Sequence, residues 1–195
     1  MDKKDAIEKL RDDEHYYGEF GKKYLSNSDI SPLLNNPLNF KKPSPQNPAF
    51  VVGGYFHTTI LEPNKLDKYK IIKPSTRNTK AYKELSNGSI CLLEHEADAI
   101  DLMREKVLDN ELFYDMIREG NVEYEVPGIT ELDGLDWKGK AYIIHHSHQL
   151  IVDLKTTHTI NSFASSAYKY NYDSQAYIYS KMFGYELIFI VVDKK

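Results

Sequence analysis

One eight-residue segment, LIVDLKTT at 150–157, most constrains what this chain can fold into. Its first three residues are apolar and predict a buried β-strand, which runs directly into the charges of Asp153 and Lys155. Alternate residues of a strand point to the same face, so these two side chains project together while Leu154 points the other way. Charges at the end of an apolar strand are costly unless they pair with each other or bind a ligand. The segment therefore allows two interpretations: a plain ion pair, or the metal-binding carboxylate and water-activating lysine of a phosphodiester hydrolase.

Composition narrows the class of protein. The chain has 195 residues, of which 41% are hydrophobic and 28% charged, so it is long enough for one domain with a core and is not a disordered chain. We find no apolar run close to the ~20 residues of a membrane span, and the charged N-terminus lacks the apolar segment of a signal peptide. The lone Cys91 excludes a disulfide framework within the chain and a four-cysteine metal site. We therefore expect a cytoplasmic protein that does not associate with membranes.

The charge balance disfavours one nucleic-acid function but not another. A net charge of −4 argues against a protein that coats nucleic acid. A nuclease stays open, because an acidic metal centre adds negative charge and DNA contacts can be confined to one basic rim. The basic residues between Lys65 and Lys80 are candidates for such a rim, although a solvated loop is the simpler interpretation.

The predicted elements follow the order helix, three strands, helix and strand, which indicates an α/β fold with a mixed sheet. Helices are expected at 2–13, directly after 24–30 with Ser28 or Asp29 as the cap, and at 49–61, 94–108, 110–118 and 160–183. Strands are expected at 121–126, 139–145, 149–155 and 186–192. The segment 64–90 is expected to be irregular, and a loop is marked by Pro37, Pro43, Pro45 and Pro48.

Five short motifs recur in one order along the chain: YLSNS at 24–28, GGYFH at 53–57, KGK at 138–140, VDLKTT at 152–157 and YDSQAY at 172–177. Together they resemble the PD-(D/E)XK nuclease superfamily, and more closely the RecE-type and lambda-type exonucleases of phage recombination. The resemblance covers most of the chain. It implies a restriction-endonuclease-like core, a mixed sheet flanked by helices in the order αβββαβ, in a single domain of residues 1–195. Residues 1–48 would be a helical and loop lead-in, and 49–195 the core.

The resemblance also implies roles for individual residues. Asp153, the backbone carbonyl of Leu154 and His57 would hold one or two Mg²⁺ or Mn²⁺ ions. Lys155 matches the catalytic lysine that orients or deprotonates water, and Gln175 matches the glutamine on the helix after the catalytic strand. A histidine on an apolar helix face is otherwise most often a core residue.

Further candidates would contact DNA or add a carboxylate. Tyr172 and Tyr179 share a helix face with Gln175, so they either contact DNA or pack in the core. Lys73, Arg77 and Lys80 are candidate phosphate contacts. Glu123 or Glu125, on the strand that enters the hairpin, would add a carboxylate, with a solvated strand face as the alternative.

One position departs from the family pattern. The pattern expects the main metal-binding aspartate eleven residues before Asp153, where this chain has Tyr142. A tyrosine is a neutral phenol at pH 7, whereas Mg²⁺ prefers hard, usually anionic oxygens. Three explanations compete: an inactivated variant of a nuclease, a natural relative that has lost catalysis, or a register change that brings in Asp133 or Asp136. The segment 137–140 fits the turn that precedes the usual aspartate, which disfavours the third.

The function that the resemblance implies is an exodeoxyribonuclease acting 5′→3′ on duplex DNA ends, for recombination or phage DNA metabolism in a bacterial cell. Its partners would be DNA ends, a single-strand annealing protein and further copies of the chain in a ring. Tyr142 predicts weak metal binding and reduced cleavage. The second hypothesis is a catalytically inactive protein that binds DNA ends or a partner.

Two other features bear on the function, a histidine cluster and the end of the chain. A zinc site at His145, His146 and His148 is disfavoured, because a solvated hairpin tip is the more common setting for such a cluster and strand alternation would scatter the three side chains. The relatives usually continue beyond the last predicted strand, so we expect either a compact version or a missing remainder.

Overall fold

The structure is a computed structural model that describes residues 1–42 and 47–194. These residues group into two compact units. The first consists of 1–42, 115–153 and 161–190, and the second of 47–114, 154–160 and 191–194. The expected division of a single domain at residue 48 stays a prediction.

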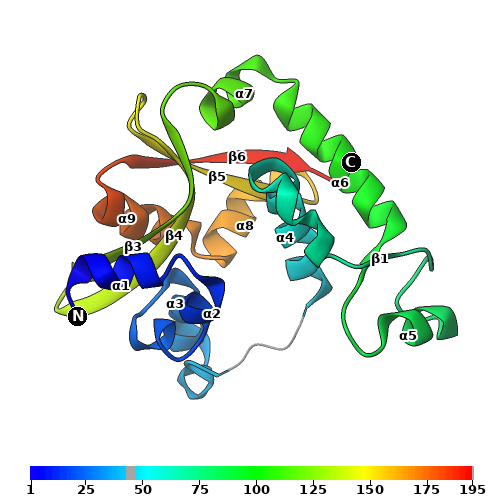
Figure 1. Ribbon diagram of the computed structural model, residues 1–195, viewed down its shortest axis with the longest axis horizontal. Helices are drawn as coiled ribbons and strands as arrows, with labels where there is room; N and C mark the ends of the chain where they lie inside the picture. Colours follow the sequence, from blue (N-terminus) through cyan, green and yellow to red (C-terminus); the bar gives the residue numbers. More distant parts are fainter. Residues whose placement is uncertain (43–46, 195) are drawn as a thin grey trace. The chain divides into compact units, whose positions relative to one another are not determined.

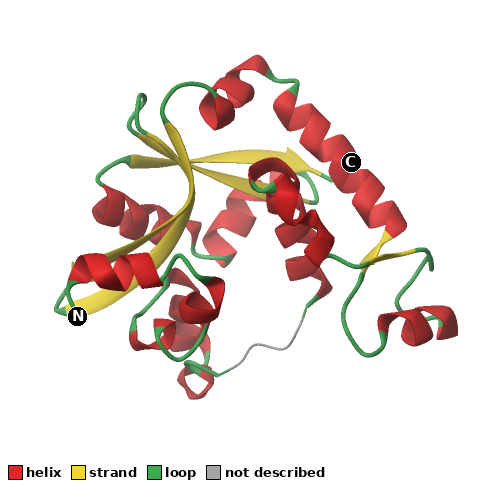
Figure 2. Cartoon of the chain, in the orientation of Figure 1, coloured by secondary structure: helices red, strands yellow, loops and turns green. Residues whose placement is uncertain are grey.

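The main sheet of the described residues has four strands in the order β3-β4-β5-β6. Its strands are β3 (Val122–Leu132), β4 (Leu135–His145), β5 (Leu150–Thr157) and β6 (Glu186–Asp193). The pairs β3–β4 and β4–β5 are antiparallel, and Figure 2 shows the strands in yellow among the helices in red. The predicted fold class, an α/β restriction-endonuclease-like core, is confirmed.

The long β3–β4 hairpin turns at Asp133 and Gly134, which both have positive φ, of 51° and 75°. A two-residue turn with positive φ at both positions is the type that matches the twist of antiparallel strands. The prediction of a turn at 137–140 is therefore wrong, since these residues lie inside β4. The lysines of that segment, Lys138 and Lys140, are buried rather than exposed at a turn.

Three short helices precede the sheet in the first unit. The single helix expected at 2–13 is divided into α1 (Lys3–Lys9) and α2 (Asp13–Tyr17), because the Asp12 carboxylate caps a new start by accepting from the backbone N–H of His15 at 3.0 Å. Helix α3 (Asn27–Asn35) is capped by Ser26, whose backbone N–H donates to the Asp29 carboxylate at 2.9 Å. The predicted caps at positions 28 and 29 are therefore two and three residues too late.

Two helices follow β5, where one was expected. Helix α8 (Phe163–Lys169) and helix α9 (Tyr172–Phe183) are separated at Asn171, whose φ of 54° is left-handed. Helix α9 packs on β3 and β4, and Tyr179 and Phe183 contact a core of Ala141 and Ile151. Short 3₁₀ turns occupy Gly21–Lys23, Pro37–Asn39 and Ile160–Ser162.

The second unit is mainly helical. Helix α4 (Pro48–Leu61) packs on α6 (Glu94–Leu108), and both were predicted within two residues of their bounds. Helix α7 (Glu111–Arg118) was also expected. The segment expected to be irregular contains a 3₁₀ helix (Pro63–Lys68), β1 (Ile71–Ile72) and α5 (Lys80–Ser86), and β1 pairs in parallel with β2 (Leu92–Leu93). Of the predicted proline loop, Pro43 and Pro45 lie outside the described residues. None of the described helices is long and apolar enough to cross a membrane.

Candidate active site

Three side chains of the first unit occupy successive positions across the sheet. The β4–β5 register pairs Ile143 with Val152, and the next step along it sets Tyr142 against Asp153. The β3–β4 register is continuous on both sides of Glu125 and Tyr142, so these two positions also face each other. The extended registers therefore place Glu125 and Asp153 on either side of the Tyr142 position, and the charges of both act on its phenol. Strands β3, β4 and β5 can be followed in Figure 1.

Asp153 is held in place by the helix that follows it. Its side chain is only 2% exposed, and its Oδ2 accepts a hydrogen bond from the side-chain amide of Gln175 on α9. Gln175 is itself buried. A buried carboxylate needs such donors because it has lost its hydrating water. The structure thus brings Asp153 and Gln175 together, although they are 22 residues apart.

The phenol of Tyr142 lies among other acidic groups. Burial raises its pKa well above 10, and the nearby charges of Asp153 and Glu125 and the neighbouring phenols of Tyr17 and Tyr179 raise it further. A phenol in this environment keeps its proton at neutral pH and carries no charge to offer a cation. Tyr142 therefore cannot replace the anionic oxygen of an aspartate.

Glu125 has an unusual backbone. Its φ of 52° lies in the left-handed region, which a residue other than glycine rarely adopts inside a strand. Such strain persists only where the surroundings impose it, and it is concentrated at functional sites. Of the two carboxylates considered for this strand, Glu125 is the one whose charge acts on the phenols of Tyr142 and Tyr179. Glu123 instead contacts the imidazole of His146 at 3.0 Å.

A layer of buried lysines continues from Tyr142 along β4. Lys140 and Lys138 are two and four positions before it, so the three side chains share a face of the strand. Lys140 pairs with Asp13 of α2 at 2.6 Å, and Lys138 donates to the backbone carbonyl of Tyr16. The Nζ atoms of Lys138 and Lys140 lie 4.0 Å and 4.7 Å from the centre of the Tyr16 ring. Sequence reasoning missed this layer, for which the alternating Lys-Gly-Lys pattern was the available signal.

The side chains around Asp153 do not make a complete magnesium site. Mg²⁺ requires close to six oxygen ligands in octahedral geometry, usually with one or two carboxylates. In residues 1–42 and 47–194, no group of three or more His, Cys, Asp and Glu side chains is arranged to hold a metal ion. Because Tyr142 supplies a neutral phenol instead of an aspartate, the present residues do not fit the metal centre that the family pattern implies.

The register change that would bring in another aspartate is excluded. Asp133 forms the β3–β4 turn, and Asp136 pairs with Glu131 next to that turn. Six strand positions separate Asp136 from Tyr142, which corresponds to about 20 Å along β4. Neither side chain is available to the Asp153 carboxylate.

The other predicted catalytic residues belong to the second unit. Leu154 and Lys155 directly follow Asp153 on β5, with Leu154 buried and Lys155 partly buried. His57 is partly buried on α4, and its ring contacts that of Phe56 edge to face, with centroids 5.9 Å apart. Their approach to the Asp153 carboxylate stays a prediction.

The candidate DNA contacts have different surroundings. The Tyr172 ring lies 5.4 Å from Phe189, and burial followed by the charge of Asp153 raises its pKa. The Tyr179 hydroxyl contacts the backbone of Lys140 at 3.3 Å. Both tyrosines therefore have core contacts, which favours packing over DNA binding for Tyr179 in particular.

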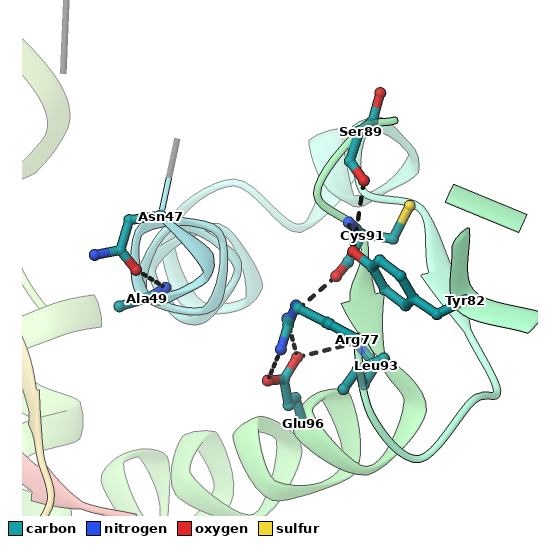
Figure 3. Close-up of polar contacts among 8 residues, drawn as sticks. All are labelled: Asn47, Ala49, Arg77, Tyr82, Ser89, Cys91, Leu93 and Glu96. Atoms are coloured by element: carbon teal, nitrogen blue, oxygen red, sulfur yellow. Dashed lines mark hydrogen bonds and ion pairs between the residues drawn. The ribbon is translucent and has the colours of Figure 1, made fainter. Parts of the chain in front are cut away.

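The basic candidates are also unequal. Arg77 makes a bidentate ion pair with Glu96, with distances of 2.7 and 2.6 Å, and donates to the Cys91 carbonyl (Figure 3). Its guanidinium thus holds the second unit together. Lys80 is highly exposed and lies 3.8 Å from Glu84, and Lys73 is exposed directly after β1. Phosphate binding by the three residues stays a prediction.

The histidine cluster is not a fully solvated tip. His145 is buried at the end of β4, with its Nδ1 accepting from the backbone N–H of His148 at 3.2 Å. Its ring centre lies 4.3 Å from that of His148, whereas His146 points to Glu123 and Tyr185. The expectation that strand alternation separates these side chains holds for His146 alone.

Comparison with known proteins agrees with this architecture. Residues 34–194 match the family model of a PDDEXK-like domain of unknown function, DUF3799. The chain belongs to this family. Among solved structures, this PDDEXK-like domain is similar to one described as "Putative exonuclease" from Eubacterium rectale, with a TM-score of 0.68 and 19% sequence identity. The similarity covers 94% of this chain and 73% of that one, and at this identity it concerns the fold alone. No curated protein matches the chain.

Proposed function

We propose that this PDDEXK-like domain is the scaffold of a metal-dependent DNA exonuclease whose cleavage is impaired by Tyr142. Family membership supports a nuclease-like function. The observation that carries the specific proposal is the row Glu125, Tyr142 and Asp153, in which a protonated phenol stands beside a fixed carboxylate. Asp153 is already oriented by Gln175, so one side chain separates the present row from the family pattern.

The proposal assigns distinct tasks to the residues of this chain. Asp153 would be a metal ligand, and Gln175 positions it by fixing one of its oxygens. Lys155, two positions later on β5, would orient the attacking water. The cofactor would be Mg²⁺ or Mn²⁺, with His57 and the Leu154 carbonyl as further ligands.

The test is the substitution Tyr142→Asp, with Tyr142→Phe as the matched control. Isothermal titration calorimetry with Mn²⁺ measures metal binding, and digestion of linear duplex DNA in Mg²⁺ measures cleavage. We expect Y142D to bind Mn²⁺ at least tenfold more tightly than the unsubstituted chain and to cleave DNA, and Y142F to do neither. Equal metal binding by all three proteins would show that position 142 is not a ligand position, and brisk cleavage by the unsubstituted chain would overturn the impairment.

The finer features of this proposal come from the resemblance alone. They are 5′→3′ digestion of duplex ends, a ring-shaped homo-oligomer, cooperation with an annealing protein and a role in phage or prophage DNA metabolism in the bacterial cytoplasm. Duplexes labelled at the 5′ or the 3′ end would give the polarity with Y142D. Light scattering after gel filtration would give the oligomeric state.

A second candidate is a protein that holds DNA ends without cutting them. The protonated phenol of Tyr142 favours it, because that residue weakens metal binding without removing the rest of the fold. Two results together would support this function over an impaired exonuclease. The unsubstituted chain would bind blunt duplex ends in EDTA, and the Y142D variant would still cleave no DNA.

A further inference from the structure

A pocket in the second unit lies outside the row around Asp153. Its volume is about 610 Å³, and its polar lining includes Lys68, Tyr69, Lys70, Ser86, Asn87 and Ser89. This volume falls within the range of about 300–1,000 Å³ typical of small-ligand sites. The lining has two ammonium groups, hydroxyls, a side-chain amide and an aromatic ring, but no carboxylate. The lining therefore offers positive charge and hydrogen-bond donors, which are the groups that complement an anion.

The two lysines of the pocket differ from several other basic residues of the unit. Lys65, Arg77 and Lys80 each have a carboxylate partner, in Glu62, Glu96 and Glu84. Lys68 and Lys70 are exposed, and among the described residues neither forms an ion pair. The Nζ of Lys68 lies 5.2 Å from the centre of the Tyr69 ring, and that of Lys70 donates to the Leu85 carbonyl at 2.6 Å. Their charges are therefore available to a ligand.

The wall of the pocket is held by hydrogen bonds from behind (Figure 3). The Tyr82 hydroxyl accepts from the backbone N–H of Cys91 at 2.9 Å and donates to the Ser89 carbonyl at 3.5 Å. Arg77 donates to the Cys91 carbonyl at 3.2 Å. The turn that brings this wall back from α5 has Asn87 and Gly88 in left-handed conformations, with φ of 48° and 81°. The backbone of this wall is thus fixed before a ligand arrives, which lowers the entropic cost of binding.

Tyr69 is fixed between the two lysines. Its hydroxyl contacts the Thr58 hydroxyl at 3.1 Å, and its ring meets Tyr55 edge to face, with centroids 5.2 Å apart. A fixed aromatic ring flanked by cations is the combination that binds single strands, in which a base contacts the ring and phosphates contact the lysines. A concave pocket suits an unpaired nucleotide better than the side of a duplex.

We propose that this pocket binds the phosphodiester backbone of a single DNA strand. The inference rests on the proposed function, because a nuclease acting at duplex ends exposes single-stranded DNA. The ligand is defined by its chemistry: bridged phosphates with at least one unstacked base.

The experiment measures fluorescence anisotropy of a labelled single-stranded oligonucleotide with the full chain in EDTA, so that cleavage does not interfere. The double variant K68A/K70A is compared with K83A, which removes an exposed lysine of α5 outside the pocket lining. We expect the double variant to raise Kd at least tenfold and to lower the slope of log K against log salt by about 1.4, since two phosphate contacts are lost. The control should stay within twofold.

Three results would overturn the inference: no binding of the oligonucleotide by the unsubstituted chain, unchanged binding by the double variant, or an equal loss in the control. Competition with inorganic phosphate and with a mononucleotide separates the sources of the phosphate. Displacement at equal concentrations by either would show a small-anion site instead of a strand site. This test can fail separately from the Tyr142→Asp test. If Y142D restores cleavage while K68A/K70A binds the single strand as tightly as the unsubstituted chain, only the proposal for the pocket is rejected.

Discussion

The side-chain amide of Gln175 donates a hydrogen bond to the carboxylate of Asp153, and both groups are buried. Helix α9 therefore fixes the orientation of the acidic residue that the family pattern places at the catalytic centre. The carboxylate is oriented although the position next to it across the sheet holds the neutral phenol of Tyr142. This separates two properties of the site, its framework and its metal-binding capacity, which can be tested independently.

The first prediction concerns this hydrogen bond. Gln175→Ala should lower the free energy of unfolding by about 1.5–3 kcal/mol, because a buried carboxylate loses a donor. Urea denaturation at pH 7 measures the change. Lys181→Ala, at an exposed position of the same helix, should stay within about 0.5 kcal/mol. A Gln175→Ala protein as stable as this control would show that the bond contributes nothing to the fold.

The second prediction concerns the contact between α9 and the sheet. A Cβ atom at Gly139 would lie 2.8 Å from Cε1 of Tyr179, so Gly139→Ala should destabilise the protein by about 1–3 kcal/mol. At Gly53, on α4, a Cβ would meet nothing within 4 Å. Gly53→Ala should therefore stabilise the helix by about 0.5–1 kcal/mol. Opposite signs in thermal denaturation are expected. A Gly139→Ala protein as stable as the unsubstituted chain would contradict the packing described for α9, and a loss of stability in Gly53→Ala would contradict the open space at that position.

The third prediction concerns pH. Burial, followed by the charges of Lys41 and Lys140, lowers the pKa of Lys138 to about 8, although Asp29 opposes this change. The unfolded chain keeps this proton up to a pKa of about 10.4, so between pH 8 and 10 it binds more protons than the folded chain. The contribution of Lys138 to stability therefore rises with pH across this window.

Urea midpoints from pH 7 to 10 should show this rise in the unsubstituted protein and its absence in Lys138→Met. In Lys41→Met the rise should move to higher pH, because one of the charges that lowers the pKa of Lys138 is removed. Identical profiles for the three proteins would show that Lys138 does not titrate in this range.

The fourth prediction concerns the strained strand position. Glycine is normally less stable than alanine in a strand, but at a φ of 52° only glycine is free of strain. Glu125→Gly should thus be more stable than Glu125→Ala by about 1 kcal/mol, as measured by urea denaturation. Both variants lack the carboxylate, so the comparison isolates the backbone. A more stable alanine variant would show that the left-handed conformation is not maintained in solution.

The sequence predicted the regular elements best where periodicity was strong. The apolar positions of α6 and the apolar run at the start of β5 gave elements close to those observed. Continuous helices were expected at 2–13 and 160–183, but Asp12 caps a second start and Asn171 adopts a left-handed conformation. Both breaks depend on local backbone geometry that hydrophobic periodicity does not report.

The buried lysines were missed for a different reason. The family pattern matches segment 137–140 to the turn before the usual aspartate, and a turn does not predict that Lys138 and Lys140 are buried. Their partners, the carbonyl of Tyr16 and the carboxylate of Asp13, are 122 and 127 residues away in the sequence. Compensation by such distant groups is visible only in the folded chain.

For the site, the resemblance identified Asp153 and Gln175, and the structure places them in contact. It did not indicate that Glu125 has a strained backbone, because φ has no counterpart in the pattern of residue types. Arg77 was a candidate phosphate contact because it lies among the basic residues between Lys65 and Lys80, and the structure adds its bidentate pair with Glu96, which the sequence did not indicate.

The tight turn at Asp133 and Gly134 has a consequence for how this protein could change. A two-residue turn fixes the register of the two long strands it joins, and a slip by one residue would turn position 142 to the opposite face of the sheet. The location of this position is thus set by the backbone and not by the side chain that occupies it. A different side chain at position 142 would therefore occupy the same place beside Asp153. A histidine there, for example, would offer a ligand for softer metals.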